Sequence, residues 1–361
     1  MILTIIASII ILSALVLIHE LGHFLTAKKA GVKIEEFAIG FPPKIWSKKI
    51  DETEYSINAV PIGGYVRMEG ELEEHPSPRA FENQSRFKRF IISISGVVMN
   101  LLLAWVILAI GFAVGMAPIV SPAKALPGEI LSSKIMIAQV NEDSPAKELG
   151  LSAGDIVISA TSDGEKFEIN NLNDLSKFTK SHKGKLAEFE YEHNKETIVN
   201  SVTISEDDEA PLGVISVEQG VVRVPWYRAP DVALRETVKI FELTAVFFQS
   251  FIAKLFSTGE VQEGIGGPVA IYAYTGTMVK AGLMAVLQFV AILSVNFALI
   301  NILPFPALDG GRIIFILSEM IAGRKLIKQK VEHIIHLAGF AILILLIIAV
   351  TYNDIVRLIK S

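Results

Sequence analysis

Four long apolar stretches constrain the fold of this chain more than any other feature. They cover residues 2–18, 91–115, 283–303 and 334–350. A helix of about 20 apolar residues is long enough to cross the roughly 30 Å hydrocarbon core of a membrane. With 51% hydrophobic residues and a mean hydropathy of +0.49, the 361-residue chain is too apolar for an average soluble protein. The sequence therefore predicts a polytopic α-helical membrane protein with four transmembrane helices.

The first apolar stretch ends in the pentapeptide His19-Glu20-Leu21-Gly22-His23. On a helix, side chains four residues apart share a face, so these two imidazoles suit two ligands of one tetrahedral metal ion. Glu20 is rotated by about 100° around the helix and lies close to the metal without having to bind it. The H-E-x-x-H pattern is typical of zinc hydrolases with a carboxylate base. Ionisable groups within membrane helices are usually functional, which favours a metal site over two ordinary buried histidines.

Composition and charge narrow the choice of ligands and partners. The chain has no cysteine, which excludes disulfides, thiolate ligands and a cysteine nucleophile, so a metal must take nitrogen and oxygen ligands. The net charge of −5 offers no basic surface, and we expect no nucleic-acid partner. The first stretch has no positively charged start and no small-residue cleavage pattern before His19, so we expect a retained helix rather than a signal peptide.

Basic residues gather at the ends of the apolar stretches and predict their orientation. Such residues are enriched on the cytoplasmic side of membrane helices. They are Lys28, Lys29 and Lys33 after the first stretch, Arg86, Lys88 and Arg89 before the second, and Arg324, Lys325, Lys328 and Lys330 before the fourth. The pentapeptide is therefore expected at the cytoplasmic side of the membrane.

Residues 31–71 predict a β-region directly after the first helix. Val32–Ile39 and Tyr55–Ala59 alternate between apolar and polar side chains, and Gly40, Pro42-Pro43 and Pro61 interrupt them. Such a pattern indicates short strands joined by turns. A strand platform near the metal site and an ordinary cytoplasmic loop both remain open on this evidence.

Residues 127–220 are polar and predict a separate α+β domain. A strand at Ile135–Val140 is followed by Ser144-Pro145-Ala146, Gly150-Leu151 and Gly154-Asp155. This spacing resembles the PDZ domains of bacterial proteases, which bind extended peptides and peptide C-termini by strand addition. About 90 residues hold one such domain, and an inert extramembrane cap is the alternative.

Residues 225–260 predict an interfacial amphipathic helix, because charged residues interrupt an otherwise apolar pattern. The third apolar stretch runs into Asn301-Ile302-Leu303-Pro304-Phe305-Pro306-Ala307-Leu308-Asp309-Gly310. The two prolines predict a break in the helix, with Asp309 just beyond it. Taken alone, Asp309 suits a helix cap as well as a ligand. His333 and His336 are expected at the membrane interface, and His75, His182 and His193 in polar segments; none is expected to be a ligand.

Three features together resemble the site-2 protease family of intramembrane zinc metalloproteases, and most closely its bacterial regulator-of-sigma-E type. These are H-E-L-G-H in the first apolar helix, the single PDZ-like segment, and N-x-x-P-x-P-x-L-D-G-G after the third. The resemblance implies that His19, His23 and Asp309 bind Zn²⁺ and that Glu20 is the catalytic base. It also implies that Asn301 and Asn296 contact the substrate. The best-known members carry two tandem PDZ domains, whereas this chain has one.

The resemblance implies regulated intramembrane proteolysis in the bacterial inner (cytoplasmic) membrane. The expected substrates are transmembrane segments of single-pass membrane proteins, such as anti-sigma factors or signal-peptide remnants, with the PDZ domain outside as a filter. The expected organisation is a membrane region at 1–117, the PDZ domain at 127–220, the interfacial helix at 225–260 and a second membrane region at 283–361. A metal transporter would not need the PDZ domain or Glu20, and a silent PDZ scaffold would not need a complete ligand set.

Overall fold

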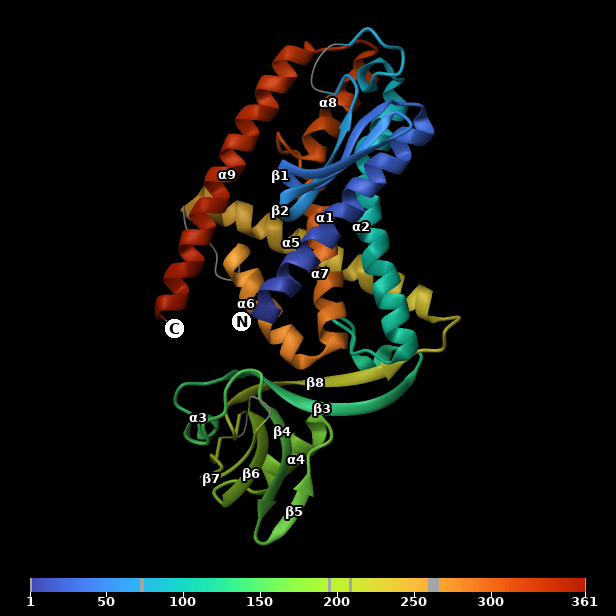
Figure 1. Cartoon of the computed structure of the whole chain (residues 1–361). Helices are drawn as coiled ribbons and strands as arrows, with labels where there is room; N and C mark the ends of the chain where they lie inside the picture. The colour runs from blue at the N-terminus through green and yellow to red at the C-terminus, as the bar shows by residue number, and fades with distance from the viewer. Residues whose placement is uncertain (1, 72–74, 194–195, 208–209, 259–265, 361) are drawn as a thin grey trace. The chain divides into compact units, whose positions relative to one another are not determined.

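The computed structural model describes residues 2–71, 75–193, 196–207, 210–258 and 266–360 (Figure 1). The chain divides into two compact units, of which one comprises residues 1–109 and 233–361 and the other comprises residues 110–232.

The first unit consists mainly of long helices. They are α1 (Ile2–Ala30), most of α2 (Arg86–Val114), most of α5 (Ala229–Thr258), α6 (Pro268–Ala281), α7 (Leu283–Ile302), α8 (Asp309–Ala322) and α9 (Gln329–Lys360), with a 3-10 turn at Phe81–Asn83. Among the described residues, four helical segments are long and apolar enough to cross a membrane: α1, α2, α7 and Lys330–Val356 of α9. The four predicted apolar helices are therefore confirmed.

The helix α5 is not among those four segments. It begins at Ala229 and is described as far as Thr258, so the last two positions of the predicted interfacial helix, 259 and 260, lie outside the described residues. The helix α6, which lies between this helix and α7, was not predicted.

One face of α1 is buried along most of its length. Its buried residues recur every three to four positions, as the helical period requires: Ser8, Ile11, Leu15, His19, Gly22, His23, Phe24 and Ala27. Leu15 packs with Leu293 of α7, whereas Phe24 packs with β-strand residues and with Ile92 of α2. Both histidines of the pentapeptide therefore point into the unit.

The β-region differs from the predicted set of short strands. It contains two long strands, β1 (Ile34–Ile50) and β2 (Thr53–Met68), which continue through the glycines and prolines that were expected to end them. β-Bulges absorb these residues, and Gly40 and Gly63 take left-handed φ values of 78° and 77°. Residues 34–39 pair with residues 64–68 on one side and with residues 54–57 on the other. Residues 64–68 consequently form an edge of this sheet.

The proline-containing segment ends α7 as predicted. The helix stops at Ile302, and the chain turns through Pro304 and Pro306 before α8 starts at Asp309. Asp309 is the first residue of α8, and Leu308 occupies the cap position without a side-chain cap. The break thus places Asp309 at the amino end of a new helix.

The second unit contains a six-stranded sheet and two short helices. The strands are β3 (Glu129–Val140), β4 (Ile156–Ser162), β5 (Glu165–Glu168), β6 (Leu186–His193), β7 (Glu196–Thr203) and β8 (Val214–Arg223). Their order is β7-β6-β4-β3-β8, with β5 paired to β4. The helices α3 (Pro145–Glu148) and α4 (Leu172–Ser181) contribute Ala146, Leu175 and Phe178 to the apolar core.

Candidate metal centre

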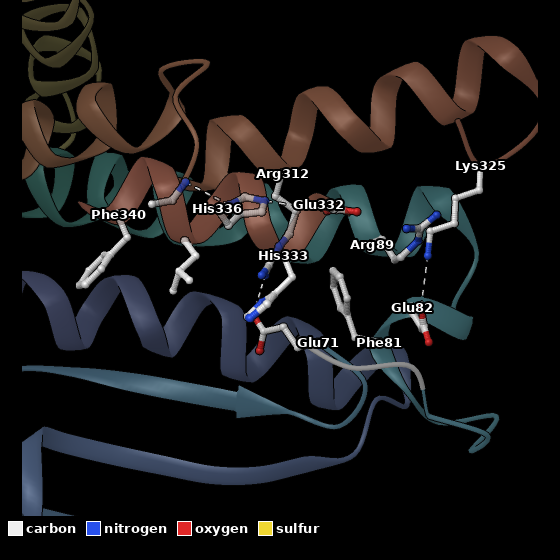
Figure 2. Close-up of a pocket in the computed structure, with 12 residues that line it drawn as sticks. Glu71, Phe81, Glu82, Arg89, Arg312, Lys325, Glu332, His333, His336 and Phe340 are labelled. Atoms are coloured by element: carbon white, nitrogen blue, oxygen red, sulfur yellow. Dashed lines mark hydrogen bonds and ion pairs between the residues drawn. The ribbon is translucent and has the colours of Figure 1, made fainter. Parts of the chain in front are cut away.

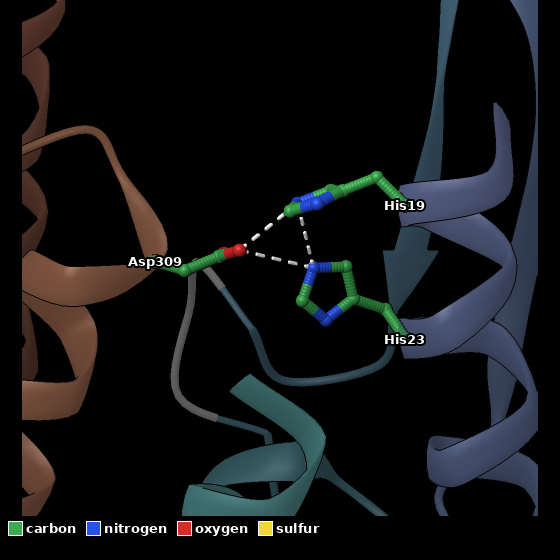
Figure 3. A group of neighbouring side chains, drawn as sticks. All are labelled: His19, His23 and Asp309. Atoms are coloured by element: carbon green, nitrogen blue, oxygen red, sulfur yellow. Dashed lines mark hydrogen bonds and ion pairs between the residues drawn. The ribbon is translucent and has the colours of Figure 1, made fainter. Parts of the chain in front are cut away.

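Three side chains from α1 and α8 converge on one point (Figure 3). Nε2 of His19 lies 2.9 Å from Oδ2 of Asp309, and Nε2 of His23 lies 3.2 Å from the same oxygen. The two Nε2 atoms are 3.2 Å apart. Two turns of one helix and the first residue of another thus present two nitrogens and one oxygen to a common centre.

This triangle fits a tetrahedral zinc ion. Zinc–nitrogen and zinc–oxygen bonds of about 2.0–2.1 Å place neighbouring ligand atoms about 3.3 Å apart, close to the three observed separations. Oδ2 of Asp309 is buried and, apart from the two imidazoles, has no partner among the described residues. A buried carboxylate oxygen with no other donor is well suited to a cation.

The helix α2 closes one side of the triangle. Nδ1 of His23 lies 2.8 Å from the carbonyl oxygen of Ile92, so Nδ1–H donates and Nε2 keeps its lone pair for a metal. Gly96 follows one turn later, and a Cβ atom there would lie 2.5 Å from Nε2 of His23 and 2.6 Å from Cε1 of His19. Only glycine leaves room for both rings at this position.

Glu20 lies beside the triangle and outside its three ligand atoms. Its Oε2 accepts a hydrogen bond from the backbone N–H of Val66 at 3.1 Å. The carboxylate lines a cavity of about 220 Å³ together with His23 and Asp309. The other lining residues of this cavity are Tyr65, Val66, Met68, Glu71, Ala307, Leu308, Arg312 and His336. One wall of the cavity is therefore the edge of the β-sheet, which the sequence could not place.

A second cavity of about 270 Å³ adjoins the first, and the two share Glu71, Ala307, Arg312 and His336 (Figure 2). Nη1 of Arg312 lies 2.5 Å from Oε1 of Glu71, whose Oε2 accepts from the N–H of Met68. Burial alone would lower the pKa of Arg312, but the charge and the hydrogen bond of Glu71, together with the charges of Asp309 and Glu332, outweigh burial and raise the pKa. This ion pair ties α8, three residues after Asp309, to the end of β2.

A family comparison decides what kind of protein carries this site. The model of peptidase family M50 matches residues 7–346. The chain belongs to peptidase family M50. This confirms the site-2 protease family that the sequence resemblance indicated, and the protein is accordingly a metallopeptidase of that family.

Relatives of this M50 peptidase match along almost their whole length. A protein of Clostridium acetobutylicum is 34% identical over 98% of this chain and 97% of its own. The zinc metalloprotease RasP of Shouchella clausii is 30% identical over 98% of this chain and 99% of its own. The regulator of sigma-W protease RasP of Bacillus subtilis is 28% identical over the same shares of the two chains. Among solved structures, a PDZ domain from Listeria monocytogenes matches 25% of this chain and 93% of its own, with 19% identity and a TM-score of 0.21.

The two asparagines assigned through the family resemblance do not line the 220 Å³ cavity. Neither Asn296 nor Asn301 is among the described residues that line it. Oδ1 of Asn296 lies 3.3 Å from Oγ1 of Thr244 on α5. Their role toward a substrate stays a prediction.

His336, which is not expected to be a ligand, lines both cavities. Its Nδ1 accepts from the N–H of Ala307 at 3.0 Å, so it supports the loop before Asp309 without joining the ligand triangle. No functional role was predicted for this residue, nor for Ile92, Gly96, Val66, Glu71 or Arg312.

Proposed function

We propose that this M50 peptidase is an intramembrane zinc metalloprotease that hydrolyses peptide bonds within transmembrane segments of other membrane proteins. The observation that carries the proposal is the triangle of His19, His23 and Asp309 with the Glu20 carboxylate beside it. The four apolar helices and the zinc metalloprotease names of the RasP relatives support it.

His19, His23 and Asp309 hold the zinc ion in this proposal, with Nε2, Nε2 and Oδ2 as ligand atoms. When bound, zinc polarises the scissile carbonyl and increases the acidity of the attacking water. Glu20 serves as general base and later returns the proton to the leaving amine. The N–H of Val66 holds one oxygen of Glu20, which leaves the other oxygen to accept the proton.

A transmembrane substrate must unwind locally before it reaches this site, because a helix shields its own peptide bonds. The sheet edge at residues 64–68 lines the cavity beside Glu20. An unwound segment can pair as an added strand with the backbone groups of this edge that Glu20 and Glu71 do not occupy. Asn301 and Asn296 are proposed to contact the substrate as the family resemblance implies. The sigma-W regulator among the relatives supports single-pass membrane proteins as the substrate class.

We propose that residues 127–220 form a PDZ domain that filters substrates. A groove of about 150 Å³ lies between α4 and residues 210–216, which lead into β8. Leu175, Thr179 and Lys180 line it from α4. The strand β8 lies at the edge of the sheet beside this groove, and a peptide C-terminus needs such an edge for strand addition.

The proposed topology places four spans in the bacterial cytoplasmic membrane, with both termini and the PDZ domain outside. Lys28 and Lys29 in the last turn of α1 support a cytoplasmic position for the metal centre. Asp309 must reach the same ion as the histidines, so an even number of spans separates the two ligand sets. For this reason α5 is proposed to lie at the interface, between membrane regions at 1–117 and 283–361.

Replacement of Glu20 by glutamine tests the proposed chemistry. Glu20→Gln keeps the shape of the side chain and removes the proton acceptor, so turnover of a model transmembrane substrate in liposomes should fall by about 10²–10⁴-fold. Zinc content should stay at one ion per chain, whereas His19→Ala should lose the metal as well. Near-normal turnover of Glu20→Gln would remove Glu20 from the mechanism, and loss of its zinc would make it a ligand.

A further inference from the structure

The middle of α2 contains a completely buried asparagine beside the metal ligands. The side chain of Asn100 has no exposed surface. Its Nδ2 lies 3.5 Å from Nδ1 of His19, while its Oδ1 is buried with no hydrogen-bond partner among the described residues. A buried amide oxygen without a donor costs free energy, so the present orientation of this side chain needs a reason.

A half-turn of the carboxamide places its oxygen next to Nδ1 of His19, which can donate to it. Oxygen and nitrogen of an asparagine side chain exchange places in this turn, and the hydrogen-bond network decides between the two orientations. With Oδ1 next to His19, the ring donates Nδ1–H to it, and Nε2 carries the free lone pair. With Nδ2 there, Nδ1 must accept, and Nε2 would carry the proton and could not bind a metal. Only the first orientation leaves the lone pair of Nε2 of His19 free to bind a metal ion beside Asp309.

The same helix already supports the other histidine in this way. The carbonyl oxygen of Ile92 accepts Nδ1–H of His23 at 2.8 Å. Ile92, Gly96 and Asn100 follow one another at intervals of four, so they lie on one stripe of α2. Ile92 supplies the acceptor for His23, Gly96 leaves the space that the two rings fill, and Asn100 places its amide next to His19.

Asn100 is also held in place from a third helix. Oγ of Ser294 on α7, which is fully buried, donates to the backbone carbonyl of Asn100 at 2.7 Å. This contact fixes the turn of α2 that carries the carboxamide.

We propose that Asn100 is a positioning residue of the metal centre: its carboxamide oxygen accepts Nδ1–H of His19 and fixes the ring with Nε2 toward the metal. The inference rests on the proposed function, since it takes His19 as a zinc ligand. Outer partners of this kind typically change metal affinity by about 10–100-fold when removed.

Two substitutions of similar size separate positioning from packing. Asn100→Leu removes the acceptor, and Asn100→Asp keeps an oxygen at the same place. The measurement is zinc affinity of the purified full chain by competition with a chromophoric chelator, together with the thermal midpoint of each protein in excess chelator. Ser93→Ala is the control, because Ser93 is a buried polar residue of the same helix whose Oγ has no hydrogen-bond partner among the described residues.

The expected result is a zinc affinity that falls by about 10–100-fold in Asn100→Leu and by less than about threefold in Asn100→Asp and Ser93→Ala. Metal-free midpoints should stay close to wild type in Asn100→Asp. Wild-type zinc affinity in Asn100→Leu, or equal losses in the Leu and Asp variants, would overturn the assignment. A wild-type chain that binds no zinc would instead refute the proposed function.

Discussion

The substitution Gly96→Ala places a methyl group directly against His19 and His23, the two proposed zinc ligands. Its Cβ would lie 2.5 Å from Nε2 of His23, 2.6 Å from Cε1 of His19 and 2.7 Å from Nε2 of His19. Ordinary van der Waals contact begins at 3.4 Å, so the rings or the helix must move by about 0.7–0.9 Å. Zinc–ligand distances tolerate only about 0.2 Å. The required movement is about four times larger than that.

We therefore expect Gly96→Ala to weaken zinc binding by at least about 10²-fold, equivalent to about 2.8 kcal/mol, and to abolish cleavage. The assay is chelator competition in detergent, with circular dichroism to verify the helical content. Gly111→Ala is the matched control, because its Cβ would meet only the flexible side chain of Met116. Wild-type zinc affinity in Gly96→Ala would show that α2 does not enclose the ligands as the structure describes.

Three further predictions concern the surroundings of the site. Arg312→Met should lower the free energy of unfolding by about 2–4 kcal/mol, because Glu71 then loses its cation, and the double variant with Glu71→Leu should recover part of it in a double-mutant cycle. In the four-span topology a cysteine introduced at the exposed Ser257 should react with an impermeant thiol reagent from outside the cell. The reaction is specific because the chain has no other cysteine. Reaction only from the cytoplasm would contradict four spans. Replacing residues 134–219 by Asn-Gly, which joins the paired residues Ser133 and Gly220, should permit cleavage of untrimmed membrane proteins. An unchanged substrate range would reduce this domain to a cap.

The grouping of His19, His23 and Asp309 is the part of the candidate site that was predictable from sequence. The pairing of His19 and His23 was predictable because side chains four residues apart lie on the same face of a helix. Asp309 could be assigned to the site only through the family resemblance. The sequence of the proline-containing loop does not indicate that the start of α8 lies next to α1. In the β-region, Gly40 and Pro61 predicted strand ends, yet strand pairing on two sides of residues 34–39 outweighed these local preferences.

The contribution of α2 was not predictable, and the reason is chemical. Ile92 acts through its backbone carbonyl and Gly96 through the absence of a side chain, so neither residue type indicates a metal site. Asn100 alone carries a recognisable group, and a polar residue within an apolar helix is the one signal that the sequence offered. The spacing 92, 96 and 100 matches the spacing of His19 and His23 because two adjacent helices have the same pitch. Where one membrane helix carries two histidine ligands four residues apart, the neighbouring helix can therefore support both of them. It does so with a hydrogen-bond acceptor for each imidazole and a glycine between the two acceptors, at intervals of four residues.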